Sequence, residues 1–109
     1  MDFTVDTKGH YDYIDITRQV EKAVKESKIK DGVAVVFVNG STAAITAMEY
    51  EKGIMKDIKK LLEDLAPEEA DYEHHKRWGD HNGAAHIKSA IIGPSLSVPI
   101  VNGQLVTGT

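Results

Sequence analysis

Cysteine is absent from the 109-residue chain, which excludes disulfides, thiolate metal ligands and cysteine nucleophiles. No apolar run approaches the ~20 residues that a membrane-spanning helix needs. The N-terminus lacks the basic-then-apolar pattern of a secretory signal. The net charge of −4 argues against a general nucleic-acid-binding surface. These absences make a cytoplasmic protein without nucleic-acid or membrane partners the default expectation.

The familiar nucleotide-binding motifs are also missing, because neither GxxxxGK[ST] nor GxGxxG occurs. The run Asn39-Gly40-Ser41-Thr42 is either an ordinary turn or a hydroxyl-rich loop whose amides suit a phosphate. Ser41 as a nucleophile is disfavoured because no nucleophile elbow surrounds it. Any phosphate site must therefore be built differently from those of the common nucleotide-binding folds.

Alternating residues in the first half of the chain predict strands. The stretches 3–5 and 11–16 alternate around Gly9-His10 and predict a first hairpin. Thr17 is suited to cap a helix with apolar residues spaced by three and four. The continuous run VAVVFV at 33–38 predicts a central strand covered on both faces. The stretch 43–49 alternates weakly and predicts a strand that pairs back.

Helix and turn signals dominate the second half. Residues 54–65 predict a strongly amphipathic helix. Asn82 is suited to cap a further helix, with Gly93 as its C′ residue. The alternating stretch 95–101 predicts a strand, and Asn102-Gly103 predicts a type I′ hairpin turn. Together these patterns predict an α+β fold with a largely antiparallel sheet.

The segment from Asp71 to Leu105 contains four of the five histidines, which makes it the candidate site. Asn82 and His86 lie four apart and so share one helix face. The start of that helix offers free backbone N–H groups to an anion. If His74 and His75 lie in an extended segment, they face opposite sides, so only one joins His86.

A pair of His74 and His86 would bring a loop ligand to a helix ligand. Asp80 could then hold one imidazole in the required tautomer. Three such groups could bind Zn²⁺ or a similar ion. Two simpler interpretations stay open: a solvated histidine-rich loop, and His86 as a half-buried residue bonded to a carbonyl.

Three stretches together resemble the YjbQ family, also called the secondary thiamine-phosphate synthase family: VAVVFVNGSTAAIT, DYEHHKRWGDHNGAAHIKSAIIGPSLSVPI and NGQLVTGT. The resemblance covers Val33 to Thr109 and includes the patterns Y-x-H, D-x-N-x-x-A-H and G-P-S-L. It implies a compact α+β domain with two packed, largely antiparallel β-sheets and two to three helices. It also implies a trimer and, as in some members, a weak thiamine-phosphate synthase activity.

The family patterns transfer to individual residues of this chain. They imply catalytic roles for His74, Asp80 and His86, with His74 and His86 as ligands of a divalent metal such as Zn²⁺ or Mg²⁺. They imply ligand binding by Ser41, Thr42 and Asn82. Many members carry a histidine before the hydroxyl pair, where this chain has Gly40. His75 or His81 could replace that ligand, or the site could hold only an anion.

Family members continue beyond the position of Thr109 with Trp-Gln and further apolar strands. The expectation is a single YjbQ-like domain over 1–109 that lacks those last strands. The face carrying Leu96, Val98 and Ile100 would then be exposed, and self-association would cover it. Two function classes follow: an enzyme acting on a small phosphorylated metabolite, or a non-catalytic protein that binds a metal or an anion.

Overall fold

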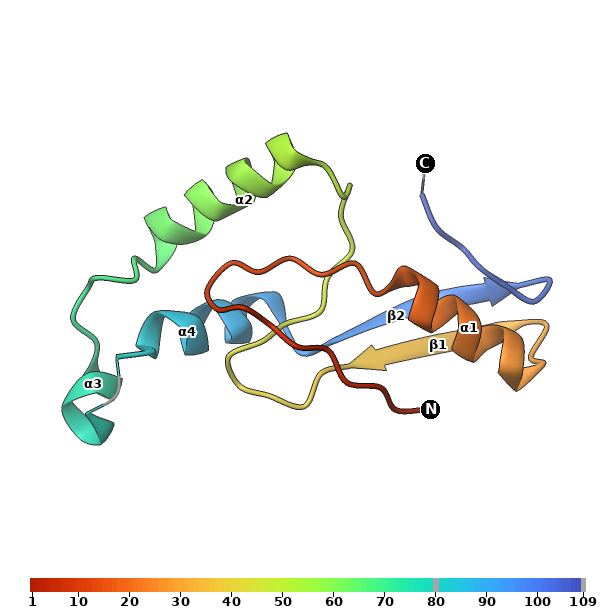
Figure 1. Cartoon of the computed structure of the whole chain (residues 1–109), viewed down its shortest axis with the longest axis horizontal. Coiled ribbons are helices and arrows are strands. Elements are labelled where there is room, and N and C mark those ends of the chain that lie inside the picture. Colours follow the sequence, from red (N-terminus) through yellow and green to blue (C-terminus); the bar gives the residue numbers. More distant parts are fainter. Residues whose placement is uncertain (80, 109) are drawn as a thin grey trace. The chain divides into compact units, whose positions relative to one another are not determined.

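A computed structural model of the chain describes residues 1–79 and 81–108. These residues form four helices and a three-stranded antiparallel sheet (Figure 1), which confirms the α+β class and exceeds the expected two to three helices. The elements are α1 (Thr17–Ser27), β1 (Gly32–Phe37), α2 (Lys52–Leu65), α3 (Glu73–Trp78), α4 (Gly83–Ile92), β2 (Ser95–Val101) and β3 (Gln104–Leu105).

The chain divides into two compact units, and each is described by itself. The first combines Met1–Val36 with the segment from Leu96 onward, and the second is Phe37–Ser95. Within the described part of the chain, no helix has the length and apolar character required to cross a membrane.

The hairpin of the first unit follows local turn chemistry. Asn102 and Gly103 have φ values of 52° and 77°, as the predicted type I′ turn requires. The turn sets the antiparallel register in which Val101 faces Gln104. The Gly103 N–H donates to the Lys30 carbonyl at 2.8 Å, which ties the hairpin tip to the segment before β1.

The core of the first unit lies between α1 and the sheet. α1 packs against β3, and Val24 and Ile100 are only 5% and 3% exposed. Leu96 and Val98, on the same strand face as Ile100, are half-buried. The expectation that this face would be exposed is therefore wrong.

β1 is not the covered central strand that its sequence predicted. The strand order β1-β2-β3 places β1 at an edge of the described sheet. Its side chains Val33, Val35 and Phe37 are 60%, 67% and 65% exposed. The unbroken apolar run of β1 therefore belongs to a strand whose one face is left exposed in the single chain.

The prediction of an N-terminal hairpin is also wrong, since no strand forms among the first sixteen residues. The turn exists, but Tyr11 adopts a φ of 59°, and the Lys8 N–H donates to the Asp12 carboxylate at 2.8 Å. At the start of α1, Thr17 does not act as the cap. Instead the Asp15 carboxylate accepts the Thr17 N–H at 2.9 Å and its hydroxyl at 2.6 Å, which lowers the pKa of Asp15.

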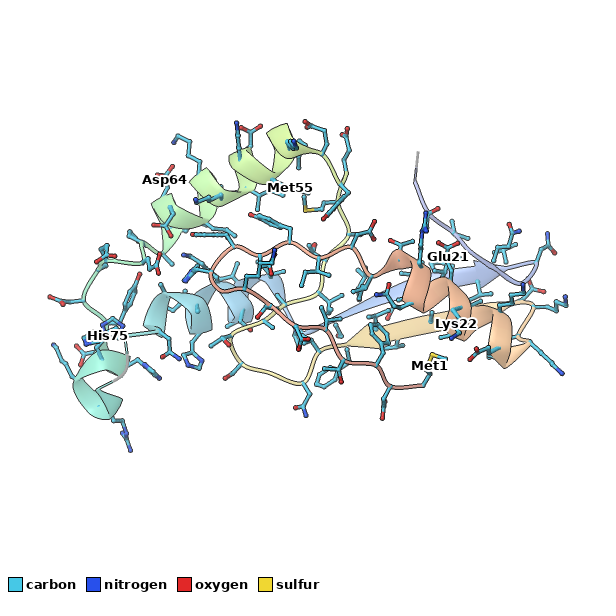
Figure 2. The ribbon with its side chains drawn as sticks, viewed as in Figure 1. Met1, Glu21, Lys22, Met55, Asp64 and His75 are labelled. Atoms are coloured by element: carbon cyan, nitrogen blue, oxygen red, sulfur yellow. The ribbon has the colours of Figure 1, made fainter. Side chains whose placement is uncertain are left out.

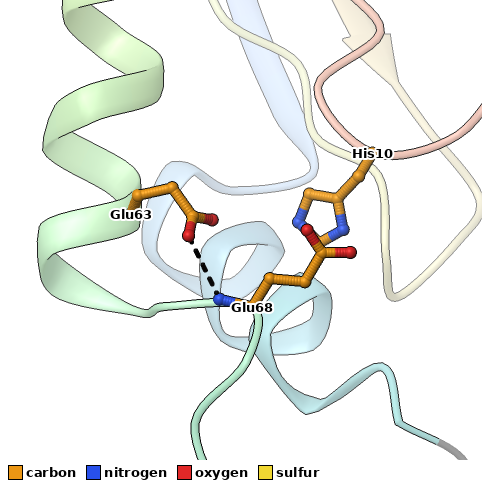
Figure 3. Close-up of side chains that lie close together, drawn as sticks. All are labelled: His10, Glu63 and Glu68. Atoms are coloured by element: carbon orange, nitrogen blue, oxygen red, sulfur yellow. Dashed lines mark hydrogen bonds between the residues drawn. The ribbon is translucent and has the colours of Figure 1, made fainter.

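In the second unit, α2 and α4 are joined by a partly buried ion pair. The Lys88 ammonium lies 2.7 Å from the Glu63 carboxylate, and Lys88 is only 5% exposed. The second oxygen of Glu63 accepts the Glu68 backbone N–H at 3.2 Å (Figure 3). Glu63 therefore holds both α4 and the chain that leaves α2.

The stretch 43–49 forms no strand and is attached to the end of α4 instead. The Ser89 hydroxyl donates to the Ala43 carbonyl at 2.5 Å, and the Ile45 N–H donates to the Gly93 carbonyl at 3.1 Å. The strand predicted from the weak alternation of 43–49 is wrong, because hydrogen bonds to α4 satisfy backbone groups of this stretch instead of strand pairing. The same bonds fix the loop that carries Ser41 and Thr42.

Candidate functional site

A short helix, α3, carries the first two histidines of the site. Glu73 lies in its first turn and basic residues lie in its last turn, an order that complements the helix dipole. Gly79 ends it with a φ of 76° and donates its N–H to the His75 carbonyl at 3.0 Å. The segment is helical, so the condition under which His74 and His75 would face opposite sides is not met. Neighbouring side chains on a helix diverge by about 100° rather than 180°, so His74 and His75 need not face opposite sides.

Four imidazoles form a continuous cluster, which we call the histidine cluster: His74, His75, His81 and His86. The ring centroids of His74 and His86 lie 4.6 Å apart with a tilt of 44°, so the predicted pairing of these two rings is confirmed as geometry. His75 lies 6.3 Å from His74 and 4.8 Å from His81. His74, His75 and His86 are half-buried, whereas His81 is exposed.

His75 makes a contact that the sequence did not indicate. Its Nε2 accepts the backbone N–H of Gly83, the first residue of α4, at 3.2 Å. Figure 2 labels the His75 side chain on α3. A neutral imidazole has one acceptor nitrogen, so this bond places the His75 proton on Nδ1. His75 is therefore unsuited to replace the missing metal ligand, and the first amide of the expected anion site is already occupied.

Asn82 holds the N-cap position of α4 but makes no side-chain cap bond, contrary to the prediction. Its Oδ1 is buried and has no hydrogen-bond partner among the described residues. An unsatisfied buried oxygen costs about 1–3 kcal/mol, so it requires an explanation. Asn82 and His86 lie one helical turn apart, and an oxygen ligand for a cation beside the imidazoles is a suitable explanation.

Gly83 permits the close contact between α3 and α4. A Cβ at this position would lie 2.9 Å from the Tyr72 Cβ and 3.2 Å from the His75 Nε2. The Tyr72 ring also meets His75 edge-on at 5.3 Å. Only glycine allows this approach, which brings the two histidine-bearing helices together.

The remaining predicted residues are placed differently. Ser41 and Thr42 are exposed in the loop after β1, and their neighbour Ala43 makes the bond to α4. Asp80 lies outside the described residues, so its predicted catalytic and tautomer-fixing roles stay predictions.

An acidic cavity of about 260 Å³ lies beside His75 and His81. Its other lining residues are Glu68, Glu69, Ala70 and Asp71. Three carboxylates at this wall make the surroundings of the histidine cluster favourable for a cation and unfavourable for a bare phosphate.

Sequence reasoning missed the role of His75 because it did not predict α3. A signal was present: an acidic residue, a basic run and then Gly79 is the order expected along a short helix. The bond from Gly83 to His75 was beyond such reasoning, because it depends on how α3 and α4 pack.

The fold and the cluster define an α+β protein with a histidine-rich helix pair. The whole chain, residues 1–109, matches the family described as UPF0047 protein YjbQ-like. A UPF0047 protein of Archaeoglobus fulgidus is 36% identical over 109 residues, all of this chain and 82% of the relative. YugU of Bacillus subtilis is 34% identical over 96% of this chain and 78% of its own length. The chain belongs to the YjbQ/UPF0047 family.

Solved structures agree with this assignment. A YbjQ-like protein of unknown function from Sulfolobus solfataricus superimposes with a TM-score of 0.90 at 37% identity, covering 96% of this chain and 75% of that one. A YjbQ/UPF0047 protein from Clostridium acetobutylicum gives a TM-score of 0.82 at 39% identity, covering 94% and 78%.

Proposed function

We propose that this protein binds a divalent metal ion through His74 and His86 and binds a small phosphorylated metabolite at that ion. The carrying observation is the distance between the two rings. Imidazoles that bind one ion at about 2.0–2.1 Å hold their ring centroids roughly 4.5–5.2 Å apart. The observed 4.6 Å lies within that range.

The chemistry of the neighbouring groups supports a metal ion over a bare anion. Asn82 supplies a buried oxygen that lacks a partner among the described residues, and the nearby cavity is lined by carboxylates. The two imidazoles suit Zn²⁺, whereas Mg²⁺ prefers oxygen ligands alone. A bound ion would supply Lewis acidity and neutralise phosphate charge.

The reaction we propose is that implied by the family resemblance, in which an aminopyrimidine pyrophosphate and a thiazole phosphate form thiamine phosphate and release pyrophosphate. The alternative is a non-catalytic metal- or anion-binding protein, and Gly40 favours it because a third histidine ligand is missing there. Incubation of the Zn²⁺-loaded protein with both substrates separates these classes. Product formation no faster than in protein-free buffer supports the non-catalytic alternative.

The binding proposal is tested by titrating the metal-free protein with Zn²⁺ in competition with a chromophoric chelator. We expect His74→Ala and His86→Ala each to weaken binding by tenfold or more, since each removes one ligand. Lys76→Ala is the matched control, because Lys76 is exposed on α3 and its ammonium group is not a metal ligand. Equal affinity of all four proteins would contradict the proposal.

We also propose that the chain assembles, as a trimer by family resemblance, and that assembly covers the open face of β1. Three large apolar side chains stand 60–67% exposed there. Contiguous apolar surface of this kind is typical of interfaces. A second packed sheet, expected from the family fold, would be contributed in this way.

A further inference from the structure

We infer that His75 is a positioning residue: by accepting the Gly83 N–H on Nε2, it sets the start of α4 and thereby holds His86 against His74. This inference rests on the proposed metal site for its binding measurement, while its structural measurement is independent of that site.

The contact joins the two helices next to the paired rings. His75 follows His74 directly on α3, and Gly83 precedes His86 by three residues on α4. The 3.2 Å bond therefore joins a residue adjacent to His74 to a residue less than one helical turn from His86. A shift at the start of α4 would move His86 relative to His74 and change their 4.6 Å separation.

The surroundings hold the His75 ring in place for this role. The Tyr72 and His81 rings each meet it edge-on, with ring centroids 5.3 Å and 4.8 Å from that of His75. The absence of a Cβ on Gly83 leaves the backbone N–H accessible to the ring. With Asn82 making no side-chain cap bond, the imidazole serves as the acceptor at this helix end.

The required feature is a hydrogen-bond acceptor at the position of Nε2. Two variants with amide side chains test this, because both carry an acceptor but only one places it at that position. The side-chain oxygen of His75→Gln reaches about as far as Nε2, whereas that of His75→Asn is one methylene shorter. We expect H75Q to bind Zn²⁺ within about threefold of the wild type and H75N to bind about tenfold more weakly, as for lost partners that orient metal ligands.

Hydrogen exchange of the Gly83 amide in the metal-free proteins gives the second readout. We expect protection in the wild type and H75Q and its loss in H75N, while the far-UV circular dichroism of all three shows folded protein. Equal Gly83 protection in H75Q and H75N would overturn the inference, as would equal Zn²⁺ affinity of these two variants when His74→Ala and His86→Ala do weaken Zn²⁺ binding. If His74→Ala and His86→Ala leave Zn²⁺ affinity unchanged, the proposed function fails, and the Gly83 measurement still decides the role of His75.

Discussion

Single residues at the start of α4 control how closely the two histidine-bearing helices approach. Gly83 has no side chain where the Tyr72 Cβ and the His75 ring come closest. Asn82 presents a buried oxygen beside it, and His75 caps the helix. The site therefore depends as much on an absent methyl group as on the imidazoles themselves.

Gly83→Ala should destabilise the protein by about 1 kcal/mol or more. Alanine favours a helix interior by roughly 0.5–1 kcal/mol over glycine, but overpacking costs about 1–3 kcal/mol. The clash wins because the opposing Tyr72 Cβ, 2.9 Å away, is next to the backbone and cannot rotate away. Urea unfolding measures the change. Gly40→Ala is the control, since nothing lies within 4 Å of its added Cβ and stability should hold or rise.

Glu51 provides a pH-dependent contribution to stability. Its carboxylate accepts the Gly53 N–H at 2.6 Å and the Ile54 N–H at 3.0 Å, and these bonds lower the pKa of Glu51. A lowered folded-state pKa gives stability that is present above the unfolded-state value of about 4.3 and is lost as the pH falls through the folded-state pKa.

Glu51→Gln should therefore be less stable than the wild type at pH 7, and this difference should shrink at pH 3. Urea unfolding of both proteins at the two pH values measures it. Glu49→Gln, an exposed change two residues earlier, is the control. A difference between Glu51→Gln and the wild type that does not change with pH would show that the cap contributes through shape and not charge.

At the scale of elements, α4 is held by bonds to distant parts of the second unit. Lys88 pairs with Glu63 of α2, and Ser89 donates to Ala43 in the loop after β1. These residues follow His86 by two and three positions. The orientation of His86 therefore depends on packing that spans much of this unit.

The Lys88–Glu63 pair should show strong coupling in a double-mutant cycle. Lys88→Met and Glu63→Gln should each cost about 1–3 kcal/mol, below the range for fully buried pairs because the Glu63 side chain is 34% exposed. The double variant should lose at least about 1 kcal/mol less than the sum. On α2 itself, the pair Lys60–Asp64 has side chains 78% and 65% exposed, so Lys60→Met should change stability by less than about 0.5 kcal/mol. Additive losses for Lys88 and Glu63 would show that the two act separately.

At the scale of the whole molecule, the open face of β1 predicts self-association. Each apolar side chain covered is worth roughly 1.5–3 kcal/mol. Val35→Lys should therefore weaken association by tenfold or more in sedimentation equilibrium, whereas Thr46→Lys, an exposed polar position, should not. A wild-type protein that stays a monodisperse monomer at micromolar concentration would remove the prediction.

The sequence by itself determined the features whose causes lie within a few residues. The spacing of α2, the stop at Gly93 and the Asn102-Gly103 turn depend on local periodicity and backbone freedom. The family patterns likewise named His74 and His86, whose rings the structure brings together.

Only the tertiary structure decided which faces are covered and which donors are used. The run in β1 reads as a buried strand, yet its place at the sheet edge leaves one face open. The N–H of Gly83 finds its acceptor eight residues back, on a helix that itself was not predicted. Such pairings depend on how separate elements pack, because a buried N–H group donates to whichever acceptor the packing brings within reach. Short-range sequence patterns do not show which acceptor that will be.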